Sequence, residues 1–208
     1  MTCCARAWFN GPSHQGSYVP YDPLAHVDAD IRERAARIGL LCLDVDGTLT
    51  DGRLYFDSEG REMKAYSVLD GQGLTQLRRF GFQVALITAR HSLSARKRGE
   101  DLGLETFIGV QDKLSCMDEL AARHGLDRER TAFVGDDLPD LDCLRTVGLS
   151  VAPANAHPWI AEIVHWKTRA RAGEGAVREV CDVLLAAQGH VPAILAGAAP
   201  GSRDGRHA

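Results

Sequence analysis

The sequence has few aromatic residues and no long hydrophobic run. Phe, Trp and Tyr make up 6% of its 208 residues, and no apolar stretch approaches the roughly 20 residues that a membrane-spanning helix needs. The formal net charge is −4, which argues against a general nucleic-acid or membrane-surface binder. With 45% hydrophobic and 25% charged residues, the composition is typical of a globular domain rather than a disordered chain. We therefore expect neither a nucleic-acid nor a membrane partner.

The six cysteines include no Cys-x-x-Cys pair, and the eight histidines show no metal-binding spacing. Cys42, Cys116, Cys143 and Cys181 lie inside apolar or helical patterns. Such cysteines are typical of small buried side chains in a reducing compartment, which argues against a disulfide framework or a zinc site. The first residues lack the continuous apolar segment of a signal peptide. We therefore expect a cytoplasmic protein.

Composition divides the chain into three parts. Residues 1–27 and 191–208 are predicted to be a flexible leader and a flexible tail, because both ends are rich in small residues, glycine and proline. Residues 28–190 alternate short apolar runs with helical patterns of about ten residues. This alternation predicts a Rossmann-like three-layer α/β/α domain with a central, mainly parallel sheet. A β-hairpin is predicted where β-prone residues 54–56 and 63–68 flank a turn.

Polar side chains follow four successive predicted strands, which end near residues 43, 88, 108 and 134. In chain order these side chains are Asp44, Asp46, Thr88, Lys113, Asp136 and Asp137. Because the carboxyl ends of parallel strands meet at one edge of a sheet, we expect these groups to lie close together. Carboxylates gathered there repel one another, and Mg²⁺ is the hard cation that suits such oxygen ligands.

These residue types fit the transfer of a phosphoryl group. Asp44 is predicted to be the nucleophile that forms an aspartyl-phosphate, and Asp46 the acid and base that exchanges a proton with the leaving oxygen and then with water. Thr88 and Lys113 are predicted to hold the phosphoryl oxygens. Asp136 would bind Mg²⁺ together with the Asp44 carboxylate and the Asp46 carbonyl. Asp137, by contrast, would not bind the metal itself but would help to orient the residues that do.

The same residues carry a family resemblance. The segments Asp44-Val45-Asp46-Gly47-Thr48-Leu49-Thr50 and Gly135-Asp136-Asp137-x-x-Asp140, with Thr88 and Lys113, resemble the four motifs of haloacid-dehalogenase-type phosphatases. Segments 50–52, 60–71, 147–152 and 175–182 further resemble the 3-deoxy-D-manno-octulosonate 8-phosphate phosphatases. The resemblance runs from about Ile38 to Gln188 and implies a haloacid-dehalogenase-like fold, a Mg²⁺ cofactor and a homotetramer. It also implies a phosphorylated acidic sugar as substrate, in the synthesis of lipopolysaccharide precursors.

The spacing of the motifs leaves no room for a cap domain. Only 44 positions separate Asp44 from Thr88, and 23 separate Lys113 from Asp136, whereas a domain needs about 50 residues of its own. Something else must then cover the site. The resemblance implies that the hairpin is used in oligomerisation and that a neighbouring subunit closes the site. The alternative is a hairpin that folds onto its own subunit.

The resemblance also implies substrate contacts outside the phosphate site, at Arg90, Arg98 and the loop residues Ser67, Val68, Asp70 and Gly71. Three positions depart from it, because Leu69, Thr75 and Glu174 stand where relatives carry a cation. Either Lys64, Arg169 or Arg171 compensates, or the substrate is another acidic sugar phosphate such as a nonulosonate 9-phosphate. An alternative of another class is a phosphate-binding or interaction module without turnover. The presence of both Asp44 and Asp46 argues against that module.

Overall fold

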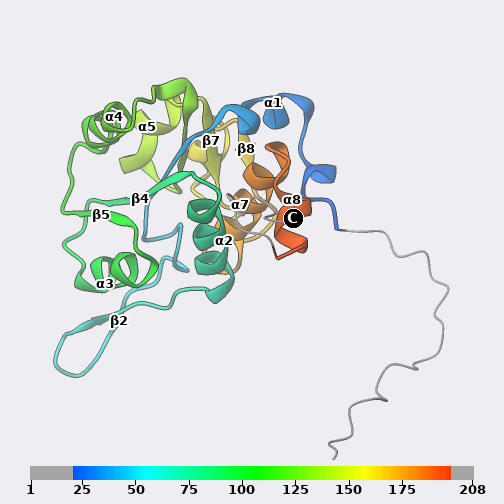
Figure 1. Cartoon of the computed structure of the whole chain (residues 1–208). Helices are drawn as coiled ribbons and strands as arrows, with labels where there is room; N and C mark the ends of the chain where they lie inside the picture. Colours follow the sequence, from blue (N-terminus) through cyan, green and yellow to red (C-terminus); the bar gives the residue numbers. More distant parts are fainter. Residues whose placement is uncertain (1–20, 198–208) are drawn as a thin grey trace, which may run out of the picture.

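The computed structural model describes residues 21–197 and arranges them around a six-stranded sheet (Figure 1). The strands lie in the order β5-β4-β1-β6-β7-β8, and all five neighbouring pairs are parallel. Their bounds are β1 Leu40–Leu43, β4 Gln83–Thr88, β5 Glu105–Ile108, β6 Thr131–Val134, β7 Leu149–Ala152 and β8 Trp166–Lys167. The predicted mainly parallel sheet is therefore confirmed.

Helices cover both faces of the sheet. Buried residues of α1 (Ala29–Arg37), α2 (Val68–Arg79), α3 (Leu93–Leu102) and α7 (Ala176–Ala187) join one hydrophobic core. Those of α4 (Lys113–Arg123), α5 (Leu141–Thr146) and α6 (Pro158–Ala161) join the other. Short 3₁₀ helices span Pro23–His26, Arg128–Arg130 and Leu138–Asp140. The arrangement is the predicted three-layer α/β/α architecture.

The sequence of the central strand explains why helices are needed on both sides. Successive side chains of a strand point to opposite faces. In β1, Leu41 and Leu43 enter the core with α2 and α7, whereas Leu40 and Cys42 enter the core with α4 and α5. All four residues are fully buried. The strand is therefore apolar throughout, and its first polar residue, Asp44, stands where the strand leaves the sheet.

Between β1 and β4 the chain forms a small hairpin and α2. Strands β2 (Tyr55–Phe56) and β3 (Glu62–Met63) pair antiparallel, apart from the main sheet, and their loop projects from the body of the molecule (Figure 1). The structure describes all of residues 44–82, and this stretch contains no cap domain. The predicted hairpin is present, but its second strand ends at Met63 rather than Val68. Val68 instead opens α2, because the Ser67 hydroxyl accepts the Asp70 N–H and caps the helix.

Both ends of the described chain carry more structure than the predicted leader and tail. Pro23–His26 forms a 3₁₀ helix, and Val27 is buried in the core beside α7. At the other end α8 spans Val191–Leu195, and Ile194 packs against the same core. The remainder of the predicted leader and tail lies outside the described residues.

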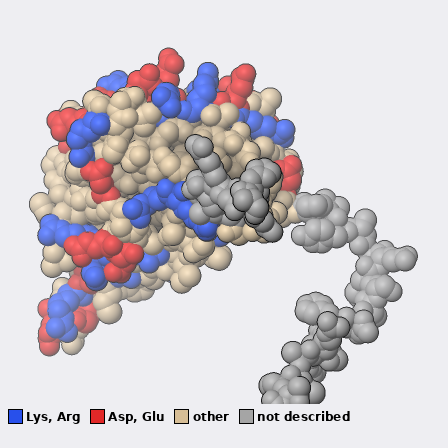
Figure 2. Space-filling model, in the orientation of Figure 1, with Lys and Arg blue, Asp and Glu red and all other residues tan. Residues whose placement is uncertain are grey.

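The described surface mixes charges of both signs. On the face drawn in Figure 2, basic and acidic side chains lie side by side, including on the projecting hairpin at the lower left. Within residues 21–197, no helix combines the length and the apolar character needed to cross a membrane.

Candidate active site

The carboxyl ends of the parallel strands surround a hollow of about 260 Å³. The six residues predicted to meet at the strand ends all line it: Asp44, Asp46, Thr88, Lys113, Asp136 and Asp137. Predicted substrate residue Arg90 also lines it, beside Gly52, Ala89, Pro139 and Asp140. The fold thus gathers the side chains expected at the strand ends, although the first and last of them, Asp44 and Asp137, are more than 90 positions apart.

Lys113 lies between two buried carboxylates. As the first residue of α4, it places its Nζ atom 2.6 Å from Oδ1 of Asp44 and 2.7 Å from Oδ1 of Asp140. Burial alone would lower the pKa of Lys113, but the two carboxylates together hold it above its ordinary value. The lysine is therefore charged in the folded protein and neutralises one of the two acids.

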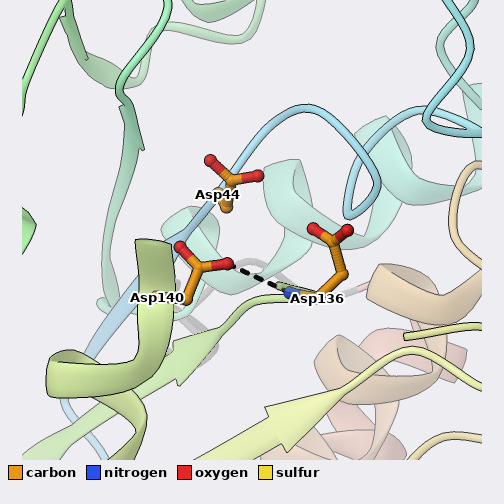
Figure 3. Close-up of side chains that lie close together, drawn as sticks. All are labelled: Asp44, Asp136 and Asp140. Carbon is orange, nitrogen blue, oxygen red and sulfur yellow. Dashed lines mark hydrogen bonds between the residues drawn. The ribbon is translucent and has the colours of Figure 1, made fainter. Parts of the chain in front are cut away.

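Three carboxylates converge here, as Figure 3 shows for Asp44, Asp136 and Asp140. One oxygen of each lies within 4.8 Å of the others. Burial, reinforced by Asp140, raises the pKa of Asp44 to about 7 despite the opposing effect of Lys113. Burial, reinforced by Asp44 and Asp140, raises the pKa of Asp136 to about 8. When all three carboxyl groups are ionised, Lys113 leaves two negative charges that a divalent cation would offset, and their oxygen donors fit Mg²⁺.

The loop after β1 lets Asp136 approach closely. Gly47 has a φ of +91°, which disfavours other residues, and a Cβ at this position would collide with the Asp136 carboxylate. The Thr48 hydroxyl donates to Oδ1 of Asp136 at 3.2 Å. Glycine is therefore required here both for the turn and for the space that Asp136 occupies.

Asp140 has a structural role that the sequence argument missed. Its Oδ1 atom accepts from Lys113, and its Oδ2 atom accepts the backbone N–H of Asp136 at 3.1 Å (Figure 3). Asp137, in contrast, is exposed and caps the following turn by accepting the Leu138 N–H at 2.8 Å. Asp140 rather than Asp137 therefore shapes the loop that presents Asp136. Its place in the fourth motif was the available signal.

Charged residues of the hairpin reach the Asp46 side chain. Lys64, which follows β3, forms an ion pair with Oδ1 of Asp46 and lies 2.7 Å from Glu62. Arg90 lies 2.5 Å from Glu62, and its Nε atom is 3.7 Å from Oδ2 of Asp46. The Lys64 side chain is only 1% exposed. Among the three cations considered for compensation, Lys64 thus lies against a residue of the hollow, whereas Arg169 and Arg171 are exposed.

The other predicted substrate residues do not line the hollow. Arg98 donates to the Ser67 carbonyl at 3.2 Å, and its guanidinium lies over the Tyr66 ring. Asp70 is buried and accepts the Arg178 N–H, while Gly71 is packed so closely that a Cβ would collide with Arg98. Val68 is 81% exposed. Within this chain, these residues shape the start of α2 and its contacts with α3 and α7.

Comparison with known proteins agrees with this geometry. A family model described as haloacid dehalogenase-like hydrolase matches residues 109–180. The 3-deoxy-D-manno-octulosonate 8-phosphate phosphatase KdsC of Yersinia pestis is 43% identical over 169 residues, which are 81% of this chain and 89% of that protein.

Two solved structures extend the comparison. A hypothetical protein of Xanthomonas campestris is 63% identical with a TM-score of 0.85, covering 86% of this chain and 98% of that one. The 3-deoxy-D-manno-octulosonate 8-phosphate phosphatase of Moraxella catarrhalis, solved with a magnesium ion, a phosphate ion and KDO, is 37% identical with a TM-score of 0.78. That match covers 81% of this chain and 97% of the other. The present chain belongs to the haloacid dehalogenase-like hydrolases and, within them, to the family of the 3-deoxy-D-manno-octulosonate 8-phosphate phosphatases.

Proposed function

We propose that this chain is a Mg²⁺-dependent phosphatase that hydrolyses 3-deoxy-D-manno-octulosonate 8-phosphate to the free sugar and inorganic phosphate. The observation that carries the proposal is the meeting of Asp44, Asp46, Lys113 and Asp136 in one hollow of phosphate-accommodating size. The proposed substrate rests on relatives named 3-deoxy-D-manno-octulosonate 8-phosphate phosphatase, which are 43% identical to this chain over most of its length. The reaction would supply a precursor of lipopolysaccharide.

In the first step, an oxygen of the Asp44 carboxylate attacks phosphorus and the bond between phosphorus and the sugar oxygen breaks. Asp46 gives a proton to that sugar oxygen, so the sugar leaves as an alcohol and the phosphoryl group stays on Asp44. In the second step, Asp46 takes a proton from a water molecule, which attacks phosphorus and releases inorganic phosphate. Lys113 holds Oδ1 of Asp44, which leaves the other carboxylate oxygen free to attack.

The phosphoryl group needs donors that offset its charge. We assign this role to Lys113, already between Asp44 and Asp140, and to the Thr88 hydroxyl. The Thr88 oxygen accepts the Arg90 N–H at 3.2 Å. This contact leaves the hydroxyl proton available for a phosphoryl oxygen.

We assign the metal site to the Asp44 carboxylate, the Asp46 carbonyl and the Asp136 carboxylate. Asp136 suits this role because its side chain receives only the Thr48 hydroxyl among the described residues. Asp140 suits it less, because Lys113 and a backbone N–H already occupy its two oxygens. When bound, Mg²⁺ would neutralise negative charge on the phosphoryl group and on the carboxylates.

We assign recognition of the acidic part of the sugar to Arg90, which lines the hollow and is partly exposed. We also propose that residues outside this hollow contribute to sugar recognition, namely Arg98 and the loop residues Ser67, Val68, Asp70 and Gly71. A nonulosonate 9-phosphate is the second candidate substrate, because Leu69, Thr75 and Glu174 stand where relatives carry a cation.

We further propose a homotetramer in which neighbouring subunits cover the open site. The hairpin supports this assembly, because Leu54, Tyr55, Phe56 and Met63 expose apolar side chains on an element that projects from the body. Light scattering should give a mass of four chains at micromolar concentration, and the mass of one chain would refute the assembly. The free thiols of Cys42, Cys116, Cys143 and Cys181 support a cytoplasmic enzyme.

A phosphate-release assay tests the proposed function. The unaltered protein is offered 3-deoxy-D-manno-octulosonate 8-phosphate, a nonulosonate 9-phosphate and a neutral sugar phosphate, with Mg²⁺ and with EDTA. Preferred release from the octulosonate, only with Mg²⁺, is expected. Preference for the nonulosonate would change the assigned substrate, and absence of any release would leave only a phosphate-binding module.

A further inference from the structure

Asp46 has two oxygens in different surroundings. Oδ1 forms the ion pair with Lys64. Oδ2 is buried and has no hydrogen-bond partner among the described residues, and the Arg90 Nε atom lies 3.7 Å from it. A buried acceptor without a partner is costly. The arrangement is therefore suited to proton exchange at Oδ2, with the sugar oxygen in the first step and with water in the second.

Lys64 is itself held in place. Its side chain is 1% exposed, and its ammonium also contacts Glu62 at 2.7 Å. Glu62 in turn binds Arg90 at 2.5 Å and the Ser92 hydroxyl at 3.3 Å. Burial raises the pKa of Glu62, but Lys64 and Arg90 together hold it below its ordinary value. A series of side-chain contacts, Ser92–Glu62–Lys64–Asp46, thus connects the start of α3, through the hairpin, to the residue proposed as acid and base of the reaction.

We propose that Lys64 is a positioning residue that fixes Oδ1 of Asp46 and thereby directs Oδ2 toward the oxygen of the leaving sugar. This inference rests on the proposed function, because it assigns to Asp46 the proton transfer described above. A carboxylate free to rotate would present either oxygen in several orientations. Held at one oxygen, it presents the other in a single orientation, and proton transfer requires such alignment.

Two kinds of leaving group should respond differently to the loss of Lys64. An alkyl oxygen, as in a sugar phosphate, needs a proton as it departs, whereas the p-nitrophenolate of p-nitrophenyl phosphate leaves without one. The kcat/KM value reports the steps up to the first irreversible one, here formation of the aspartyl-phosphate. Loss of Asp46 alignment should therefore reduce kcat/KM for the sugar phosphate and spare that for the aryl phosphate.

The experiment compares the unaltered protein with Lys64→Met, Asp46→Asn and the double variant on both substrates. Lys64→Met should lower kcat/KM for the sugar phosphate at least about tenfold, since proton transfer contributes 10²–10⁴-fold. It should change kcat/KM for p-nitrophenyl phosphate less than about threefold. In the Asp46→Asn background, Lys64→Met should add little further loss, measured as single-turnover phosphoenzyme formation, because Lys64 acts through Asp46.

Controls separate the possible outcomes. Lys97→Met makes the same substitution at an exposed lysine that, within residues 21–197, pairs only with Glu100 and Asp101 on α3, and should leave activity on both substrates unaffected. Lys64→Arg should restore part of the sugar-phosphate rate. If Lys64→Met does not fold, Glu62→Gln, which removes the second anchor of Lys64, should show the same selective loss to a smaller extent.

Equal losses on both substrates would overturn the positioning role. Losses that multiply in the double variant would also overturn it, by pointing to direct contact between Lys64 and the sugar. Failure of the unaltered protein to release phosphate from the octulosonate, by contrast, would reject the proposed function itself.

Discussion

The Oδ1 atom of Asp140 lies 2.7 Å from the ammonium of Lys113, and both side chains are buried. The same carboxylate binds the Asp136 N–H through its second oxygen. Asp140 therefore fixes, at once, the cation beside Asp44 and the backbone of Asp136. A residue expected only to complete a motif is central to the geometry of the site.

Replacing Asp140 should thus disturb both the position of Lys113 beside Asp44 and the backbone of Asp136. Asp140→Asn keeps the shape but removes the charge that faces Lys113, and we expect kcat to fall by at least about 100-fold and the Mg²⁺ requirement to rise. Asp137→Asn provides the comparison, because the Asp137 side chain only caps an exposed turn. Steady-state kinetics at several Mg²⁺ concentrations measures both effects, and equal losses in the two variants would be inconsistent with this assignment.

Gly47→Ala tests the close approach of Asp136. The new Cβ would collide with the Asp136 carboxylate, so we expect the Mg²⁺ concentration for half-maximal activity to rise at least about tenfold. Gly60→Ala is the matched control, since Gly60 also has a positive φ, of 76°, but has open space around it. Both substitutions strain the backbone, at a cost of about 1 kcal/mol. Only the first should change the response to Mg²⁺, and a similar change in Gly60→Ala would count against the steric argument.

Lys113→Met should leave Asp44 and Asp140 without their buried counter-charge. Breaking such a buried pair costs about 3–5 kcal/mol in the free energy of unfolding, and we expect a loss of this size at pH 8 in the absence of metal. The loss should shrink at pH 5, because the pKa of Asp44, raised to about 7, lets that carboxyl take up a proton there. Burial also raises the pKa of Asp140, which acts in the same direction. Urea unfolding at the two pH values measures it. A loss independent of pH would show that packing rather than charge dominates.

Stability of the metal-free protein should depend on pH in a defined direction. The pKa values of Asp44 and Asp136 rise from 3.8 to about 7 and about 8 on folding. The folded state therefore binds more protons than the unfolded state between about pH 4 and pH 8, and the contribution of these groups to stability decreases as pH rises through that range.

Mg²⁺ should oppose this decrease, because it replaces the protons as the counter-charge. Thermal unfolding with and without Mg²⁺ should give a larger increase in Tm at pH 8 than at pH 5.5. Asp136→Asn should reduce the difference between the two pH values. A Tm increase that is the same at both pH values would contradict the raised pKa values.

The sequence predicts the sheet and the catalytic hollow well, because both follow from local patterns and one rule of topology. Apolar strands such as 40–43 are buried on both faces, and the ends of parallel strands necessarily share an edge. The register that brings Asp44 beside Lys113 follows from the same rule.

The parts that were missed depend on long-range packing. Lys64 has the sequence pattern of a surface lysine, and only the return of the hairpin toward the sheet buries it against Asp46. Strand β8 is two residues long and is defined by its pairing with β7 rather than by its own composition. Likewise, Asp140 could be recognised as a partner of Lys113 only once α4 and the loop after β6 were placed together.

Covalent labelling of Asp44 tests the central claim most directly. The Asp46→Asn variant is mixed with Mg²⁺ and 3-deoxy-D-manno-octulosonate 8-phosphate or p-nitrophenyl phosphate and quenched in acid, and its peptides are analysed by mass spectrometry. The account predicts one phosphoryl group on the peptide that contains Asp44, with no label when Asp44 is also replaced by Asn. Turnover by the unaltered protein without any such label, or a label at another residue, would contradict the assignment of Asp44 as the nucleophile.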